Sequence, residues 1–145
     1  MIRAVLLVFV AAGCSHPKPA CPTGSLQGAE FCVTLPAGFQ ERSDKQLDGW
    51  DTREYNAGDA SGKLLMRVNP NASYDAEIKN STTGSATERH DITGGIAWQT
   101  QYCDGECLHI AASIIKVAHG VVRCSLSTKN ANDPGLTSCA TLRPL

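Results

Sequence analysis

The sequence contains no apolar run long enough to cross a bilayer as a helix, and no excess of charge of either sign. The apolar run at 4–12 (AVLLVFVAA) falls well short of the about twenty residues that a membrane-spanning helix needs. Thirteen basic residues stand against fourteen acidic ones, which leaves a formal net charge of −1. Because no basic face is implied, nucleic acid is not an expected partner.

Motifs of known catalytic chemistry are also missing. His90 and Asp91 are adjacent, but neighbouring residues of a strand point to opposite faces, so they do not form a dyad. Ser113 lacks the Gly-x-Ser-x-Gly context of a nucleophile elbow, and Gly94-Gly95 lacks the spacing of a phosphate-binding loop. Trp50 and Trp98 could line a ligand groove, although core packing is the default for both. The sequence therefore predicts a protein that is not an enzyme, with no catalytic residue and no cofactor.

What is present begins at the N-terminus. A positive start with Arg3, the apolar run and the small residues after it are typical of a secretory signal peptide. Ala11-Ala12-Gly13-Cys14 resembles the lipobox of bacterial lipoproteins, in which the cysteine is acylated, with palmitate among the chains, and becomes the mature N-terminus. The resemblance implies a signal peptide at 1–13 and a lipid bilayer as the partner of acylated Cys14. Ser15 in place of Asp implies the outer membrane, by likeness to lipoproteins of Gram-negative cells. An ordinary secreted protein is the alternative.

The chain has seven cysteines, and setting Cys14 aside leaves six. An even number in an exported protein predicts three disulfides and no metal site. Asp-Gly inside 103–107 (CDGEC) is a strong hairpin signal, and a three-residue loop places its two cysteines opposite each other. Order along the chain suggests the other two pairs, although other pairings remain open. The favoured pairs are Cys21–Cys32, Cys103–Cys107 and Cys124–Cys139. The alternative is a zinc site from Cys103, Cys107, His109 and Cys124.

The chain divides into the signal peptide, a flexible tether at 14–28 that is rich in Pro, Ser and Gly, and one domain at 29–145. Asp133-Pro134 is a helix start, and Leu136, Cys139 and Leu142 follow at intervals of three. Apolar periodicity predicts a further helix at 74–80 and strands at 30–35, 50–55, 63–68, 86–92, 96–102, 108–117 and 121–128.

Two segments carry a second resemblance. The run 31–39 (FCVTLPAGF) is similar to the opening of PsbP-like and DcrB-like domains, and 139–144 (CATLRP) is similar to their ending. The resemblance implies an α+β fold, with an antiparallel sheet of about five to seven strands and one or two helices packed on it. It implies a binding or assembly module and transfers no catalytic residue. The three predicted disulfides depart from the commoner pattern of that group.

These observations favour a non-enzymatic lipoprotein of the cell envelope that faces the periplasm or the surface. We expect it to bind a protein or cell-wall partner, with the hairpin tip at Asp104, Gly105 and Glu106 exposed. The first alternative is a small ligand- or metal-binding domain that uses the Cys hairpin and His109. The second is a small hydrolase, for which a clustered Ser/His/Asp or paired-carboxylate pocket would have to exist.

Overall fold

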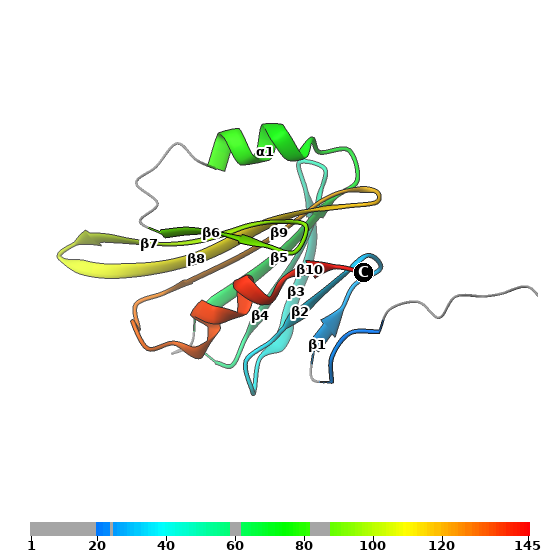
Figure 1. Ribbon diagram of the computed structural model, residues 1–145. Helices are drawn as coiled ribbons and strands as arrows, with labels where there is room; N and C mark the ends of the chain where they lie inside the picture. The colour runs from blue at the N-terminus through cyan, green and yellow to red at the C-terminus, as the bar shows by residue number, and fades with distance from the viewer. Residues whose placement is uncertain (1–19, 24, 59–61, 82–87) are drawn as a thin grey trace, which may run out of the picture.

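A computed structural model describes residues 20–23, 25–58, 62–81 and 88–145. Two antiparallel sheets make up most of it (Figure 1). The large sheet has the strand order β3-β4-β5-β9-β8-β7-β6, and the small sheet has the order β1-β2-β10. The large sheet is built from β3 (Gln40–Leu47), β4 (Trp50–Asn56), β5 (Lys63–Asn69), β6 (Glu88–Ile92), β7 (Gly95–Asp104), β8 (Glu106–Val117) and β9 (Gly120–Thr128). The small sheet is built from β1 (Ser25–Gln27), β2 (Phe31–Thr34) and β10 (Arg143–Pro144).

The helical content is small, which corrects the α+β expectation. The described residues contain one α-helix, α1 (Tyr74–Ser81), and one 3-10 helix, η1 (Pro134–Thr141). The predicted antiparallel sheet is confirmed, but a second sheet accompanies it and the fold is mostly β. The second sheet went unpredicted because two of its strands are only two and three residues long, too short for a periodic pattern.

The main core lies between the large sheet, the small sheet and η1. Alternation along β5 and β9 sends one set of side chains to this side, including Leu64, Met66, Val122 and Leu126, each at most 2% exposed. Val33 of β2 and Cys139 and Leu142 from the C-terminal segment belong to the same buried cluster. This face of the large sheet supplies most of the burial that the fold depends on.

A second cluster lies on the opposite face of the large sheet, where α1 runs (Figure 1). Its buried members are Trp98, Ala112, Ile114 and Val121, and Tyr74 and Ile78 of α1 pack against it. No residue of α1 is itself fully buried. The helix therefore contacts this cluster through side chains that are only partly buried.

Strand β3 is the strand of the large sheet that the sequence did not predict. Its residues (QERSDKQL) are almost all polar and show no apolar alternation. None of their side chains is buried in the structure. Pairing with β4 holds it in place, with a register shift between Glu41 and Ser43. Charged side chains and a bulge are typical of an edge strand that is protected from pairing with other chains.

Strand β1 lies within 14–28, the stretch that the sequence predicted to be a flexible tether. It pairs with β2 through Leu26 opposite Val33, and Cys21 is joined to Cys32. The ordered structure therefore begins before Ala29, the predicted start of the domain. The predicted signal peptide and Cys14 lie outside the described residues.

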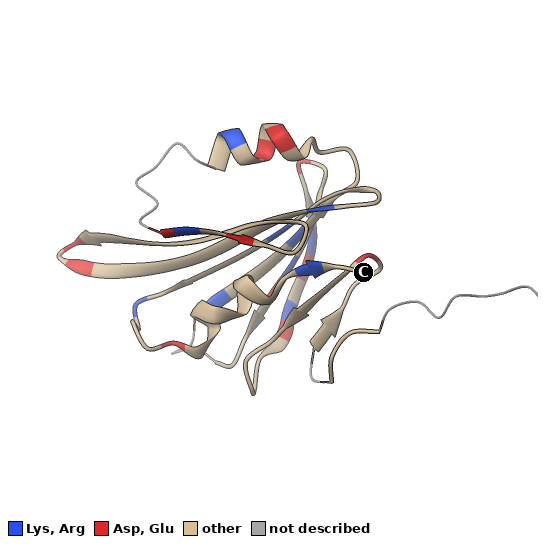
Figure 2. Cartoon of the chain, in the orientation of Figure 1, with Lys and Arg blue, Asp and Glu red and all other residues tan. Residues whose placement is uncertain are grey.

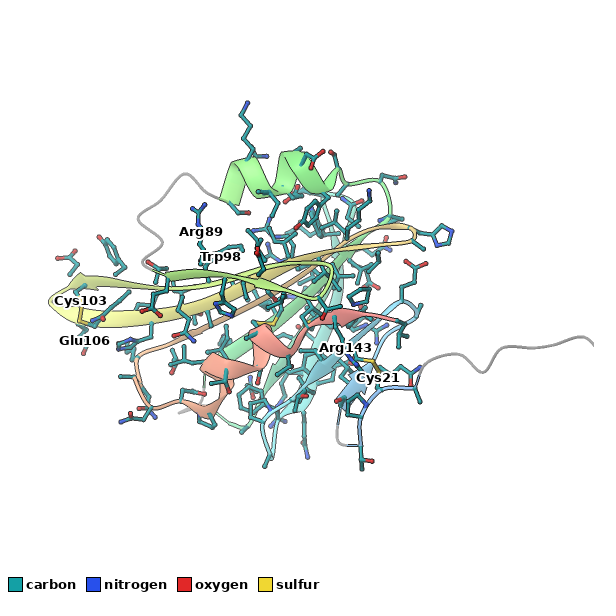
Figure 3. The ribbon with its side chains drawn as sticks, viewed as in Figure 1. Cys21, Arg89, Trp98, Cys103, Glu106 and Arg143 are labelled. Carbon is teal, nitrogen blue, oxygen red and sulfur yellow. A yellow bond between two sulfur atoms is a disulfide. The ribbon has the colours of Figure 1, made fainter. Side chains whose placement is uncertain are left out.

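Three disulfides join the six cysteines in the described residues, in the pairs that local geometry and sequence order favoured (Figure 3). The Cα atoms are 5.6 Å apart in Cys21–Cys32, 4.1 Å in Cys103–Cys107 and 5.3 Å in Cys124–Cys139. Cys103 and Cys107 face each other at the end of the long β7–β8 hairpin, with Gly105 at φ +78° in its turn. Cys124–Cys139 joins β9 to η1.

The helix predicted after Asp133 is present as a 3-10 helix. Asp133 caps it by accepting a hydrogen bond from the Gly135 backbone N–H at 2.8 Å. A 3-10 helix has three residues per turn, so apolar residues at intervals of three fall on one side. This explains why Leu136, Cys139 and Leu142 all reach the main core.

Candidate ligand pocket between the two sheets

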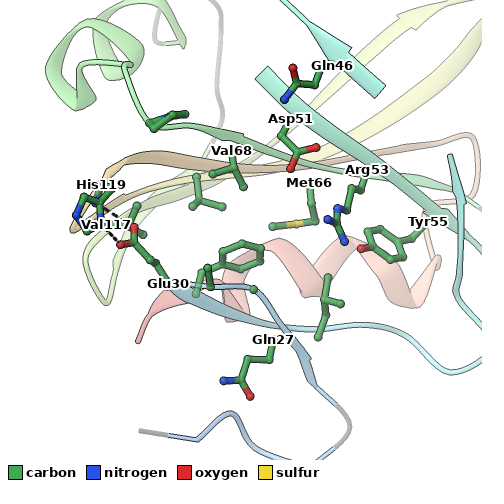
Figure 4. A pocket seen from close by; sticks show the side chains of 16 residues that line it. Gln27, Glu30, Gln46, Asp51, Arg53, Tyr55, Met66, Val68, Val117 and His119 are labelled. Atoms are coloured by element: carbon green, nitrogen blue, oxygen red, sulfur yellow. Dashed lines mark hydrogen bonds and ion pairs between the residues drawn. The ribbon is translucent and has the colours of Figure 1, made fainter. Parts of the chain in front are cut away.

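A pocket of about 640 Å³ lies between the large sheet and the β1–β2 hairpin (Figure 4). The β1–β2 hairpin contributes Leu26 through Phe31 to one wall. The facing wall comes from β3, β4, β5 and β9, and the turn between β8 and β9 closes one end. Ligand pockets typically measure about 300–1,000 Å³, so this volume suits a small organic molecule.

The floor of the pocket is apolar. Met66 is 2% exposed and Val122 is fully buried, and the two point from neighbouring strands toward the small sheet. Val68 and Val117 extend this surface, and Phe31 faces it from β2. An apolar floor of this kind favours ligands that bury hydrocarbon or aromatic surface.

One wall of the pocket is polar and comes from β4. Asp51, Arg53 and Tyr55 alternate along the strand and so share its pocket face (Figure 4). On β3, the register sets Asp44 opposite Arg53 and Glu41 opposite Tyr55. Cross-strand partners share a face, so three carboxylates surround the single guanidinium of Arg53.

Glu41 connects Tyr55 and Arg53. The Tyr55 hydroxyl donates a hydrogen bond to Glu41 Oε2 at 3.1 Å, and Arg53 Nη1 lies 3.7 Å from the same oxygen. Burial raises the pKa of Tyr55, and the charge and hydrogen bond of Glu41 raise it further against the opposing effect of Arg53. Partial burial lowers the pKa of Arg53, but Glu41, Asp44 and Asp51 outweigh this and raise it. Tyr55 is therefore a neutral donor and Arg53 a cation at physiological pH.

Glu30 and His119 close the other end of the pocket. Glu30 Oε2 accepts a hydrogen bond from the His119 backbone N–H at 3.0 Å, and Glu30 Oε1 contacts His119 Nδ1. The Leu145 backbone N–H donates to the Glu30 carbonyl at 2.9 Å. Three segments, the β1–β2 turn, the β8–β9 turn and the C-terminal residue, are thus tied together. Figure 4 shows the contact between Glu30 and His119 beside the pocket.

The residues of the predicted Cys hairpin lie far from this pocket, at the tip of β7–β8 (Figure 3). Glu106 contacts Lys129 there, and the hydrogen bond and charge of Lys129 lower the pKa of the Glu106 carboxyl. Acidic residues occupy this tip in Figure 2, and Tyr102 beside it is 64% exposed. Cys103, Cys107 and Cys124 are all in disulfides, so the alternative zinc site with His109 is wrong.

The structure does not bring His90, Asp91 and Ser113 together into a site. His90 and Asp91 are exposed on β6, whereas the Ser113 hydroxyl is fully buried on β8 and has no hydrogen-bond partner in the described chain. Trp98 is buried in the second cluster, and Trp50 packs against it with the Arg123 guanidinium 5.7 Å from its ring centre. In the described residues, no group of three or more His, Cys, Asp or Glu side chains could hold a metal ion.

Sequence reasoning missed the pocket. Alternation within 50–55 already placed Asp51, Arg53 and Tyr55 on one face, but nothing indicated which face was enclosed. Glu41 and Asp44 belong to β3, whose polar sequence carried no strand signal. The pocket depends on the second sheet, and short strands that pair across the whole chain leave no local pattern.

No protein-family model matches the chain, and no curated protein matches it significantly. Among the helices that the structure describes, none has the length and apolar character needed to span a membrane.

Proposed function

We propose that this protein is a non-enzymatic lipoprotein of the bacterial cell envelope, anchored through acylated Cys14, which acts as a binding module. The observation that carries the proposal is the cysteine pairing. Cys14 stands outside the three disulfides that join the other six of the seven cysteines. Disulfides persist in oxidising compartments outside the cytosol, and the N-terminal signal accounts for export and for Cys14.

The likeness to PsbP-like and DcrB-like domains supports a binding role and remains part of the proposal. Its opening segment forms β2, which the tight turn at Pro36–Gly38 follows, and its closing segment ends η1 and enters β10. Ser15 supports the outer membrane as the location. The partner is a protein or the cell wall, and the long disulfide-closed hairpin offers a rigid surface for it (Figure 1).

Intact mass of the full-length product, isolated from membranes, tests the anchor. We expect a chain that starts at Cys14, carries acyl mass on that residue and has six oxidised cysteines. A Cys14→Ser variant should stay unacylated and leave the membrane fraction. A wild-type mass that corresponds to the unprocessed chain from Met1 would contradict both the anchor and the export signal.

Cross-linking in intact cells tests the binding role of the hairpin. Asp104→Ala with Glu106→Ala removes two carboxylates at the tip and should abolish a cross-linked partner. Glu88→Ala with Asp91→Ala makes the same charge change on exposed residues of β6 and should retain it. Loss of the partner in both variants, or in neither, would contradict a role for the hairpin tip.

The pocket between the sheets favours a second candidate, the binding of a small ligand by the same envelope protein. Its volume and apolar floor carry this candidate. Binding of a ligand there requires neither the hairpin nor a metal, so the two candidate roles can coexist on one domain.

A further inference from the structure

We propose that the pocket between the two sheets binds a small amphipathic amine, with an apolar body over Met66 and Val68 and a protonated amino group at Asp51. This inference rests on the second candidate function and names its ligand class. It follows from two separate features of the pocket, its apolar floor and the sign of the charge on its walls.

The floor fixes the apolar part of the ligand. Met66, Val68, Val117 and Val122 form a continuous surface at the bottom of the pocket, and Phe31 faces them from the small sheet. Each methylene group that a ligand buries there should strengthen binding about fourfold. A fully hydrated ion without an apolar body would gain nothing from this surface.

The charges on the pocket walls indicate which polar group the ligand carries. Among the described residues that line the pocket, Asp51 and Glu30 are the two carboxylates and Arg53 is the one Lys or Arg side chain. Glu41 and Asp44, on the neighbouring strand, further oppose the positive charge of Arg53. The carboxylates therefore outnumber the cation, and the local potential favours a positively charged group.

Asp51 is the carboxylate that is best placed to accept an ammonium group. Its side chain is half-buried beside Val68, its cross-strand partner, and points into the pocket (Figure 4). No hydrogen bond to the side-chain carboxylate of Asp51 is found in the described part of the chain, whereas the Glu30 carboxylate already accepts two from His119. A half-buried carboxylate with free acceptor positions gains charge-assisted hydrogen bonds from an ammonium donor.

An anionic ligand would be opposed at the same place. Arg53 could contact a carboxylate or a phosphate, but Glu41 is 3.7 Å from its guanidinium, and Asp44 and Asp51 are close. A ligand anion that reached Arg53 would meet these like charges, each of which disfavours binding. The pocket therefore selects amines over acids of the same chain length.

Met66 provides a direct probe of this binding. The chain has two methionines, and Met66 lies on the pocket floor, so methyl-13C-methionine labelling of the full chain gives few signals in NMR spectra. Hexylamine, hexanol and hexanoate share a six-carbon chain and differ in charge. We expect hexylamine to shift the Met66 methyl signal saturably, hexanol to do so more weakly, and hexanoate to leave it unchanged.

Two variants at the wall test the charge argument. Asp51→Asn should weaken hexylamine binding about fivefold, as expected for loss of one partly exposed ion pair. Asp104→Asn makes the same change at the remote hairpin tip and should leave binding unchanged. Arg53→Gln removes the one cation and should strengthen hexylamine binding. An unshifted Met66 signal in the ligand-free variants shows that the pocket is intact.

N-acetyl-lysine amide distinguishes two sources of the same chemistry. If it displaces hexylamine with similar affinity, the amine is a lysine side chain of a partner; if it does not, the ligand is a free amine. Equal binding of all three six-carbon probes, no binding at all, or preferential binding of hexanoate that Arg53→Gln removes would overturn the proposal. These outcomes do not depend on acylation, so the mass measurement tests the lipid anchor independently of ligand binding.

Discussion

At the scale of single residues, Gly120 carries a constraint that no other residue type meets. It has φ +97° at the start of β9, and a Cβ atom there would lie 2.1 Å from the Asn69 carbonyl oxygen. Gly105 at the hairpin tip also has a positive φ, of +78°, but a Cβ there would meet nothing within 4 Å. Alanine substitutions at Gly105 and Gly120 therefore distinguish the cost of backbone strain alone from the cost of strain together with a steric clash.

We expect Gly105→Ala to lower the free energy of unfolding by about 1 kcal/mol, through left-handed strain alone. Gly120→Ala should cost about 3 kcal/mol, because the clash with the Asn69 carbonyl adds to the same strain. Urea denaturation of the two variants measures the difference. Equal effects would show that the β8–β9 turn can move away from Asn69.

Tyr55 links the pocket wall to the stability of the fold. Burial and Glu41 raise the pKa of its phenol above the unfolded value of about 10. The stabilisation is therefore complete below that unfolded value and is lost as the pH rises through the higher folded pKa. As the pH rises above about 10, the free energy of unfolding should therefore fall.

Tyr55→Phe should reduce the slope of that fall, which urea denaturation at several pH values measures. Tyr74 contributes to the remaining slope, since burial and then Asp75 and Asp91 raise its pKa. Tyr102→Phe removes an exposed phenol and serves as the control. A wild-type slope in Tyr55→Phe would contradict the role of the Tyr55–Glu41 pair.

At the scale of elements, η1 depends on one carboxylate. Asp133 is 6% exposed, and its Oδ1 accepts from the Gly135 N–H while its Oδ2 accepts from the Gly62 N–H, both at 2.8 Å. Asp133 therefore both caps η1 and ties it to the segment before β5. Removing the Asp133 carboxylate takes away the acceptor of both of these buried N–H donors.

Asp133→Ala should lower the free energy of unfolding by about 3 kcal/mol, since each unsatisfied buried donor costs about 1–3 kcal/mol. Asp133→Asn keeps one oxygen acceptor and should cost roughly half as much. Thermal unfolding of both variants gives the values. An alanine variant no less stable than the asparagine variant would mean that water replaces the lost acceptors.

Individual strands also differ in how well the sequence predicts them. Strong alternation in 63–68 and 121–128 predicted β5 and β9 to within a residue, because one face of each is buried. Asp-Gly between two cysteines predicted the β7–β8 turn through its chemistry. The polar residues of β3 have no buried face, so only pairing with β4 defines that strand. The candidate pocket needs β3 and the small sheet, and this explains why its polar wall was not predicted.

At the scale of the whole molecule, the cysteine pairing was predictable and the layering was not. Parity and local turns pointed to the three disulfides, whereas the contact of β10 with β2 joins positions more than a hundred residues apart. Two of the disulfides hold segments of these layers together. Cys21–Cys32 holds the segment before β1 on the small sheet, and Cys124–Cys139 joins the large sheet to η1.

Loss of the Cys124–Cys139 disulfide should therefore lower the free energy of unfolding more than loss of the Cys103–Cys107 disulfide. The first spans 15 residues and both cysteines are 1% exposed, whereas the second spans 4 at an exposed tip. Chain entropy gives about 3 kcal/mol for the longer loop and about 2 kcal/mol for the shorter one. Paired alanine variants, compared by urea denaturation, measure both.

Unfolding under reducing conditions tests how much the three disulfides together contribute to the stability of the fold. A domain of this size has a total stability of about 5–15 kcal/mol, so losing three disulfides of about 2–3 kcal/mol each removes much of it. We expect the urea midpoint to fall sharply in excess dithiothreitol, and a Cys103→Ala, Cys107→Ala variant to fall from a slightly lower start to the same end point. An unchanged midpoint with all six thiols free would show that the core alone holds the two sheets together, and would remove the support that the disulfides give to the proposed export.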